Sequence, residues 1–290
     1  NQLIVGKGAH VGVASPGEAG SWQREGKGYQ FWGRADADGS FAINNIRPGD
    51  YNLYAWVPGF VGDYKYNAAV TISPGLDMDV GEIVFEPPRV GPTLWEIGIP
   101  DRSAAEFYIP DPNPEYINKL YVNHPDRFRQ YGLWERYAEL FPDKDLVYTI
   151  GANDYSKDWF FAHVTRKLGD NSYSGTAWQI KFNLEAVEER TTYTLRVALA
   201  SANDAELEVR VNDNDGMVGT VVFRSGATGR DNAIARHGIR GLYHLFHVDV
   251  PGEKLAAGLN SISLTQILCD GPFQGFMYDY IRLEGPALSP

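Results

Sequence analysis

The chain has 290 residues, of which 22% are charged, and its formal net charge is −11 at pH 7. That charge argues against a nucleic acid or an anionic membrane surface as the partner. Aromatic residues make up 13%, beside 31 Gly and 17 Pro, which favours an all-β protein with aromatic pairs across strands and Gly and Pro in turns. Sugar-binding proteins share this composition, but aromatic β-cores without a ligand show it equally.

The single cysteine, the apolar runs and the first residues add few constraints on where the protein acts. Cys269 has no second thiol for an intrachain disulfide, so the cellular compartment stays open. No apolar run approaches the ~20 residues that a transmembrane helix needs. Residues 1–20 lack the basic start of a signal peptide and an initiating Met, and they read like the interior of a domain. We therefore expect a processed or excised piece of a longer protein.

Alternating apolar and polar residues dominate the first part of the chain. The pattern predicts strands at 9–14, 67–75 and 79–88, three strands separated by turns within 34–59, and a Gly-rich loop at 15–32. Asp36-Ala37-Asp38-Gly39 looks like part of a cation loop, but the remaining ligands are missing and a hairpin turn explains it better. These elements predict a short β-sandwich that ends near Pro88.

The second part, from about 91 to 286, also reads as β-structure. The predicted strands are 147–154, 158–167, 176–184, 192–202, 206–213, 219–225, 242–250, 260–267 and 276–285, at the spacing of a sandwich or jelly roll. A helix is predicted within 125–141, where apolar residues recur at helical spacing and most simply pack on the sheet.

Three long segments resemble one family. Residues 38–56 (DGSFAINNIRPGDYNLYAW) are similar to the small sandwich that follows the catalytic domain in plant-type rhamnogalacturonan lyases of polysaccharide lyase family four. Residues 91–142, which begin GPTLWEIGIPDRS, and 272–285 (PFQGFMYDYIRLEG) resemble the opening segment and closing strand of the C-terminal jelly roll of these enzymes. The resemblance covers essentially the whole chain.

The resemblance implies a two-domain, all-β architecture. Residues 1–88 are expected to form a fibronectin type III or prealbumin-like sandwich, which lacks its first strand if residues 1–8 do not supply one. Residues 89–290 are expected to form a galactose-binding-like jelly roll with a short helix. The prolines of 91–114 then mark the entrance to the second domain.

The resemblance also implies a function. The family cleaves the rhamnose–galacturonate bond by β-elimination, with a Lys and a His of a large N-terminal domain that has no counterpart here. We therefore expect a non-catalytic, extracellular or cell-wall module that holds rhamnogalacturonan I, an acidic plant polysaccharide, near that catalytic domain. No organic cofactor is expected. One alternative is a structural module that packs on the catalytic domain without binding sugar.

The densest basic cluster of the second domain comprises Arg230, Arg236, His237 and Arg240. Arginine guanidinium groups match uronate carboxylates bidentately, so the cluster is a candidate for anion recognition. The alternative is a solvated or structural loop. A His between arginines could also act as the base of a retained lyase activity.

Aromatic candidates for sugar stacking are numerous. Trp134 lies on the expected helix, and Phe273 lies in the loop before the last strand, next to Gln274, a polar candidate for binding the sugar. In the Gly-rich loop of the first domain the candidates are Trp22, Tyr29, Phe31 and Trp32. Each of these rings could instead be buried in a core, and the sequence does not separate the two roles.

A structural calcium ion is a further expectation. Carbohydrate-binding jelly rolls often hold one between their first and last strands, where Glu96 and Asp279 lie in this sequence. The alternative is a surface Glu and an Asp bonded to the backbone. Residues 212–216 (NDNDG) are better read as a turn. His244 and His247 should point to opposite faces of one strand, which argues against a shared metal.

Overall fold

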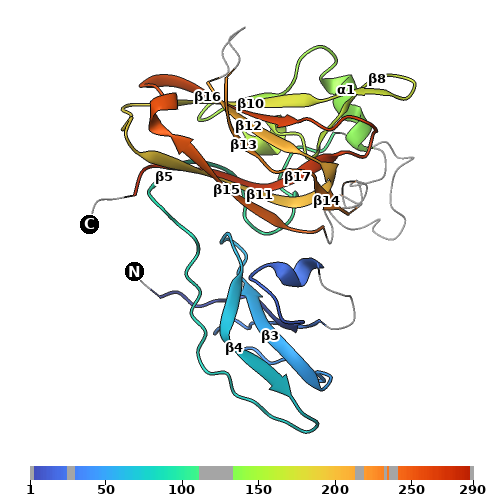
Figure 1. Cartoon of the computed structure of the whole chain (residues 1–290), viewed down its shortest axis with the longest axis vertical. Helices are drawn as coiled ribbons and strands as arrows, with labels where there is room; N and C mark the ends of the chain where they lie inside the picture. The colour runs from blue at the N-terminus through green and yellow to red at the C-terminus, as the bar shows by residue number, and fades with distance from the viewer. Residues whose placement is uncertain are drawn as a thin grey trace. The chain divides into compact units, whose positions relative to one another are not determined.

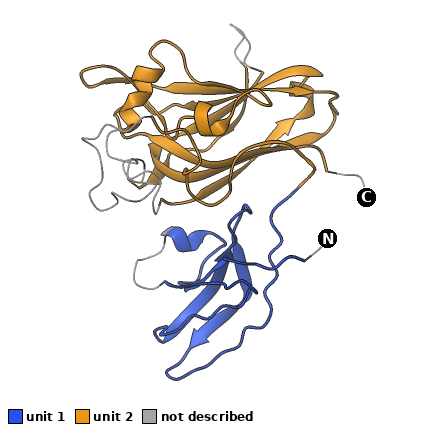
Figure 2. Ribbon diagram, turned by 180° about the vertical axis from the view of Figure 1, so that it is seen from behind, with its two compact units in different colours: residues 1–89 blue, residues 90–290 orange. Residues whose placement is uncertain are grey.

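The computed structural model describes residues 3–24, 30–110, 133–212, 219–231, 234 and 241–287. The chain forms two compact units, residues 1–89 (unit 1) and residues 90–290 (unit 2), coloured separately in Figure 2. Within the described ranges, no helix has the length and apolarity required to cross a membrane.

Unit 1 is built on one four-stranded antiparallel sheet. Its strands are β1 (His10–Ala14), β2 (Phe31–Arg34), β3 (Gly49–Trp56) and β4 (Tyr64–Ile72), in the order β2-β1-β3-β4. The 3₁₀ helix η1 (Ser21–Arg24) lies in the connection between β1 and β2. Because side chains alternate along a strand, Val11, Val13 and Leu53 share the face that forms the core of this unit.

Two strands predicted in unit 1 are absent from the described structure. Residues 40–46 and 79–88 run without strand pairing, although Ile43, Val80 and Ile83 still pack against the core. In both segments the backbone enters the left-handed region, at Asn45 (φ 59°) and at Gly81 (φ 68°). Because a ladder needs continuous extended backbone, these segments supply apolar contacts but no sheet hydrogen bonds.

Unit 2 is a sandwich of two sheets with smaller additions (Figure 1). One sheet has the order β13-β12-β16-β10-β6, and the other has the order β14-β11-β17-β5, with β15 paired to β11 and β7 paired to β17. The strands are β5 (Thr93–Gly98), β6 (Val147–Thr149), β7 (His163–Val164), β8 (Arg166–Gly169), β9 (Ser172–Ser174), β10 (Thr176–Leu184), β11 (Thr192–Ala205), β12 (Leu207–Val211), β13 (Thr220–Arg224), β14 (Thr228–Arg230), β15 (His244–Pro251), β16 (Gly258–Gln266) and β17 (Gly275–Glu284).

The inner faces of the two sheets enclose a single aromatic-rich core. Trp178 and Phe182 from β10 meet Ile97 from β5 and Ile281 from β17, all of them buried. The described residues are thus dominated by strands, which confirms the all-β fold class. The predicted strand at 176–184 coincides with β10.

Short helical segments lie at the edges of this sandwich. They are η5 (Leu133–Glu135), α1 (Arg136–Leu140), α2 (Tyr155–Asp158) and η7 (Gly252–Lys254). Of the helix expected within 125–141, the structure describes only the part from 133 onward, which is helical up to Leu140. Its buried residues, Leu133, Trp134 and Tyr137, pack on the sheets as expected.

Candidate functional site

Two of the predicted stacking residues meet at one end of unit 2. Trp134, on η5, is buried with 3% of its surface exposed, whereas Phe273, in the loop before β17, is 48% exposed. Their ring centroids are 5.2 Å apart and their planes meet at 42°. Because Trp134 is buried, it can only support its neighbour, and Phe273 is the ring of this pair that a ligand can contact.

Hydrogen bonds hold the Phe273 loop in place. The Oε1 atom of Gln274 accepts from the backbone N–H groups of Asp270 (2.5 Å) and Gly271 (3.1 Å). The side-chain amide of Asn203, on β11, donates to the carbonyl oxygen of Phe273 (2.9 Å). Gln274, a candidate sugar-binding residue, thus uses its side-chain oxygen to shape the loop. A loop held in this way loses little conformational entropy when a ligand binds.

Of the predicted basic cluster, the structure places Arg230, which ends β14 and is exposed. Arg236, His237 and Arg240 lie outside the described residues. Their role in recognising an anion, and the alternative role of His237 as a base, stay predictions.

The expected calcium ligands do not come together as a pair. Glu96 is exposed on β5 opposite Arg282, and its Oε2 atom accepts a hydrogen bond from the Tyr280 hydroxyl. Asp279 lies three residues before Arg282 and is fully buried. Among the described side chains, no three His, Cys, Asp or Glu residues gather where they could share a metal ion. Calcium binding stays a prediction.

Asp279 has a different local role. Ala198 lies opposite Tyr280 and Leu199 opposite Tyr278, so Asp279 is the extra residue of a β-bulge in β17. Its Oδ1 atom accepts from the backbone N–H groups of Asp101 (3.0 Å) and Arg102 (2.6 Å), which fixes the loop after β5. Burial raises the pKa of this carboxyl well above its usual range, and the nearby acids Asp101 and Glu106 act in the same direction.

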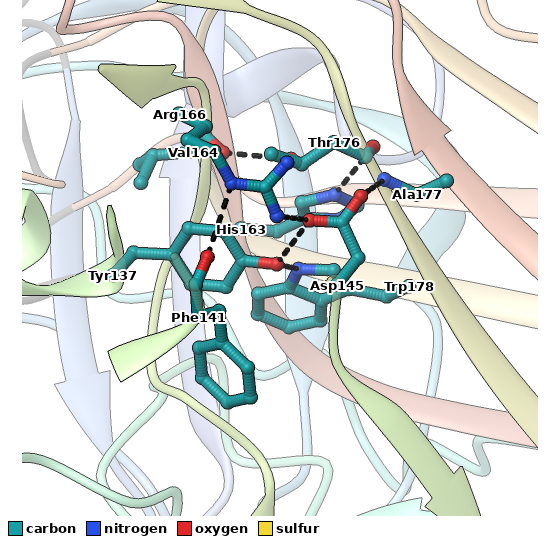
Figure 3. A network of polar contacts seen from close by, with 9 residues as sticks. All are labelled: Tyr137, Phe141, Asp145, His163, Val164, Arg166, Thr176, Ala177 and Trp178. Atoms are coloured by element: carbon teal, nitrogen blue, oxygen red, sulfur yellow. Dashed lines mark hydrogen bonds and ion pairs between the residues drawn. The ribbon is translucent and has the colours of Figure 1, made fainter. Parts of the chain in front are cut away.

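A second polar network ties the helical segment to the sheets (Figure 3). Asp145 is its centre: Oδ1 accepts from the Tyr137 hydroxyl (2.8 Å) and from the Arg166 guanidinium, and Oδ2 accepts from the Ala177 N–H (2.7 Å). The indole N–H of Trp178 donates to the Tyr137 hydroxyl (2.9 Å). Burial, and then the Asp145 charge, raise the pKa of Tyr137. The network holds α1 and β8 against β10.

Buried arginines form a third network on the outer face of the β11–β17 pair. Arg196 and Arg282 stand opposite each other in the register, and both contact the buried carboxylate of Glu284. Although burial opposes it, hydrogen bonds from Arg196 and from the Val90 N–H leave the pKa of Glu284 below its usual range. Burial and then the Arg196 charge lower the pKa of the neighbouring His247.

These described networks organise the fold, and their histidines are engaged in it. His163 has both ring nitrogens engaged, at 2.8 Å to the Tyr278 hydroxyl and 3.1 Å to the Thr176 carbonyl. His247 is held beside a cation that disfavours protonation. Sequence reasoning missed the Asp145 and Glu284 networks. A signal for the Glu284 network was the charged residue Arg196 among apolar residues of β11, whereas Asp145 lies outside the strands, between α1 and β6.

Two models of protein families match the chain. Residues 93–283 match the model described as "CBM-like: Polysaccharide lyase family 4, domain III". Residues 6–80 match the model described as "fn3_3: Polysaccharide lyase family 4, domain II". The two matches follow one another along the chain, one within unit 1 and one within unit 2.

Several curated proteins are similar to the chain. The "Rhamnogalacturonate lyase" of Dickeya dadantii is 27% identical over 282 residues, which is 94% of this chain and 41% of that protein. The "Probable rhamnogalacturonate lyase B" of Aspergillus flavus is 30% identical over 190 residues, 62% of this chain and 28% of that protein. The "Rhamnogalacturonate lyase B" of Emericella nidulans is 29% identical over 187 residues, 61% of this chain and 27% of that protein. The chain therefore spans well under half the length of these relatives.

Proposed function

Since the chain belongs to polysaccharide lyase family 4, of which it carries domains II and III, we propose that it binds and positions an acidic pectic polysaccharide, rhamnogalacturonan I. The chain binds the polymer, and the catalytic domain of a longer parent protein cleaves it. The observation that carries the proposal is the half-exposed Phe273 ring. Phe273 lies on a loop fixed by Gln274, and its ring packs against the buried Trp134.

The chemistry of this end of unit 2 suits a sugar. A pyranose presents an apolar face of C–H groups that packs on an aromatic ring, and the buried Trp134 packs against the Phe273 ring from behind. An acidic chain also needs local cations to meet a polyanion, and Arg236 and Arg240 are proposed to supply them.

Such a module assists catalysis through local concentration. A tethered binding domain keeps the polymer near the active site, so that the next encounter is effectively intramolecular. We place the parent protein in the extracellular space or the cell wall, where its substrate occurs. The Asp279 region is the place where we would look for a structural calcium ion.

Calorimetric titration tests the proposal directly. We expect the chain to bind rhamnogalacturonan I more tightly than homogalacturonan or a neutral galactan. Phe273→Ala should weaken that binding about three- to tenfold, the size of one lost aromatic contact. Phe60→Ala removes another partly exposed Phe, 38% exposed and in unit 1, and should leave the affinity unchanged.

Two outcomes would contradict the proposal. Indifference to all three polysaccharides would favour the alternative of a structural module that packs on the catalytic domain. Release of an unsaturated uronate, detected by its ultraviolet absorbance and lost in His237→Ala, would mean that the chain cleaves the polymer itself.

A further inference from the structure

The second face of the unit 1 sheet carries aromatic and basic side chains. Val11, Val13 and Leu53 point into the core, so the alternating residues of the same strands point to the opposite face. The register places Arg34, His10 and Trp56 in one row across β2, β1 and β3, and Trp32, Gly12 and Tyr54 in the next. We call the group Arg34, His10, Trp56 and Trp32 the tryptophan face.

The indole of Trp32 lies flat on the sheet because residue 12 is a glycine. A Cβ atom at position 12 would stand 2.3 Å from Cδ2 of Trp32 and 2.5 and 2.6 Å from Cε3 and Cε2. Cδ2 is a fusion carbon bonded to three other ring carbons, so it can be approached this closely only from the flat face of the ring. One indole face therefore rests on Gly12, and the other is directed away from the sheet.

Neighbouring groups fix the orientation of this indole. The Nε1 atom of Trp32 donates to the side-chain oxygen of Gln30 (3.3 Å). The Trp22 ring centroid lies 4.6 Å from that of Trp32, with the two planes tilted by 56°, and the Trp22 N–H is bonded to Asp63 (3.0 Å). The two indoles thus meet at an open angle instead of closing into a parallel stack, and Trp32 stays partly exposed.

Positive charge lies on the same face, farther along the sheet from the Trp32 ring. Arg34 is exposed and two residues from Trp32 on β2, so their Cα atoms are about 7 Å apart on one face. Its guanidinium lies over Gly8, where a Cβ would stand 3.4 Å from Nη2. His10, next to Arg34 in the register, stacks on Trp56 with the ring centroids 4.2 Å apart and the planes 2° from parallel. In a chain of net charge −11, this arrangement favours an anionic ligand.

We propose that the tryptophan face is a second saccharide subsite, in unit 1, which takes an acidic oligosaccharide. One pyranose ring stacks on the outward face of Trp32, and the carboxylate of another uronate residue of the same oligosaccharide pairs with the Arg34 guanidinium over Gly8. This inference deepens the proposed function and rests on it, but it uses residues distinct from those of unit 2. It also gives Gly12 a role, since any larger residue there would displace the indole.

The test uses the whole chain with Phe273→Ala, so that binding through unit 2 is weakened first. Trigalacturonate is titrated by calorimetry, with galactotriose as the uronate-free probe. We expect trigalacturonate binding to persist in Phe273→Ala and to be lost when Trp32→Ala is added. Arg34→Gln should weaken trigalacturonate about tenfold, as expected for one charge-assisted hydrogen bond, and leave galactotriose unaffected. Arg47→Gln, at another exposed arginine of unit 1, is the matched control.

The outcomes separate this inference from the proposed function. If Trp32→Ala and Arg34→Gln bind trigalacturonate like their parent while Phe273→Ala weakens binding, the inference is overturned and the unit 2 site stands. If Trp32→Ala abolishes binding and Phe273→Ala has no effect, the unit 2 site is refuted and the inference stands. If Trp32→Ala changes the sedimentation of the chain but not its sugar affinity, the face is a protein contact and the inference fails. Arg34→Gln, at an exposed position, keeps the test decisive should Trp32→Ala unfold.

Discussion

At the scale of single residues, His163 shows how burial selects one protonation state. A carbonyl oxygen can only accept, so the contact from Nε2 to the Thr176 carbonyl requires the proton on Nε2. Nδ1 is then the acceptor for the Tyr278 hydroxyl. Burial lowers the pKa of His163 from its ordinary 6.5 to about 3, so the ring stays neutral in the folded protein well into the acid range.

His163 should make the stability of unit 2 depend on pH. Below pH 6.5 His163 binds a proton in the unfolded chain but not in the folded chain, so the free energy of unfolding falls as the pH drops toward 3. From pH 7 to pH 5 this group alone should remove about 2 kcal/mol from the free energy of unfolding. Urea unfolding followed by tryptophan fluorescence at both pH values measures it. His163→Gln should show a smaller difference, and an unchanged difference would refute the assignment.

At the scale of elements, Asp145 joins three parts of unit 2 that are distant in sequence. Its carboxylate accepts from Tyr137 on α1, Arg166 on β8 and Ala177 on β10. The Asp145 and Arg166 side chains are 19% and 14% exposed, so the pair is screened only in part. Removing one partner leaves the other charge poorly solvated.

We expect Asp145→Ala to destabilise unit 2 by about 2 kcal/mol, which is less than the ~3–5 kcal/mol of a fully buried pair. The matched control is Glu139→Ala, on α1, which removes the exposed partner of Arg136. It should lower the free energy of unfolding by less than about 1 kcal/mol. Chemical unfolding compares the two variants. Equal effects would show that the network does not hold the helix in place.

Element by element, the sequence predicted strands well where the alternation was long and the backbone regular. The predicted strand at 276–285 corresponds to β17 (Gly275–Glu284), and 192–202 falls within β11 (Thr192–Ala205). It failed at 79–88, where the apolar residues alternate but Gly81 turns the backbone. Periodicity reports which side chains are buried, and it does not report whether the backbone finds a partner strand.

At the scale of the whole molecule, each unit has its own hydrophobic core. Leu53 belongs to the core of unit 1 and Ile281 to that of unit 2, and both are buried. A unit with its own core can unfold as its own cooperative step.

Differential scanning calorimetry should therefore resolve two transitions. Leu53→Ala and Ile281→Ala should each destabilise their own unit by about 2–5 kcal/mol, and each should lower the midpoint of one transition only. A single transition shifted by both variants would mean that the two cores unfold together.

The sequence by itself determined the all-β class, most strand positions and the resemblance to polysaccharide lyase family 4, because alternation, turn residues and long motifs are local properties. It named Trp134, Phe273 and Trp32 as aromatic candidates but could not tell which rings are buried. Tertiary structure decided that Trp134 is buried, that Phe273 is half-exposed and that the Trp32 ring lies on Gly12. It also decided that Glu96 binds the Tyr280 hydroxyl while Asp279 binds the backbone of Asp101 and Arg102. The physical reason is that register, bulges and the packing of residues far apart in the chain set exposure and charge pairing, and none of these is written in local spacing.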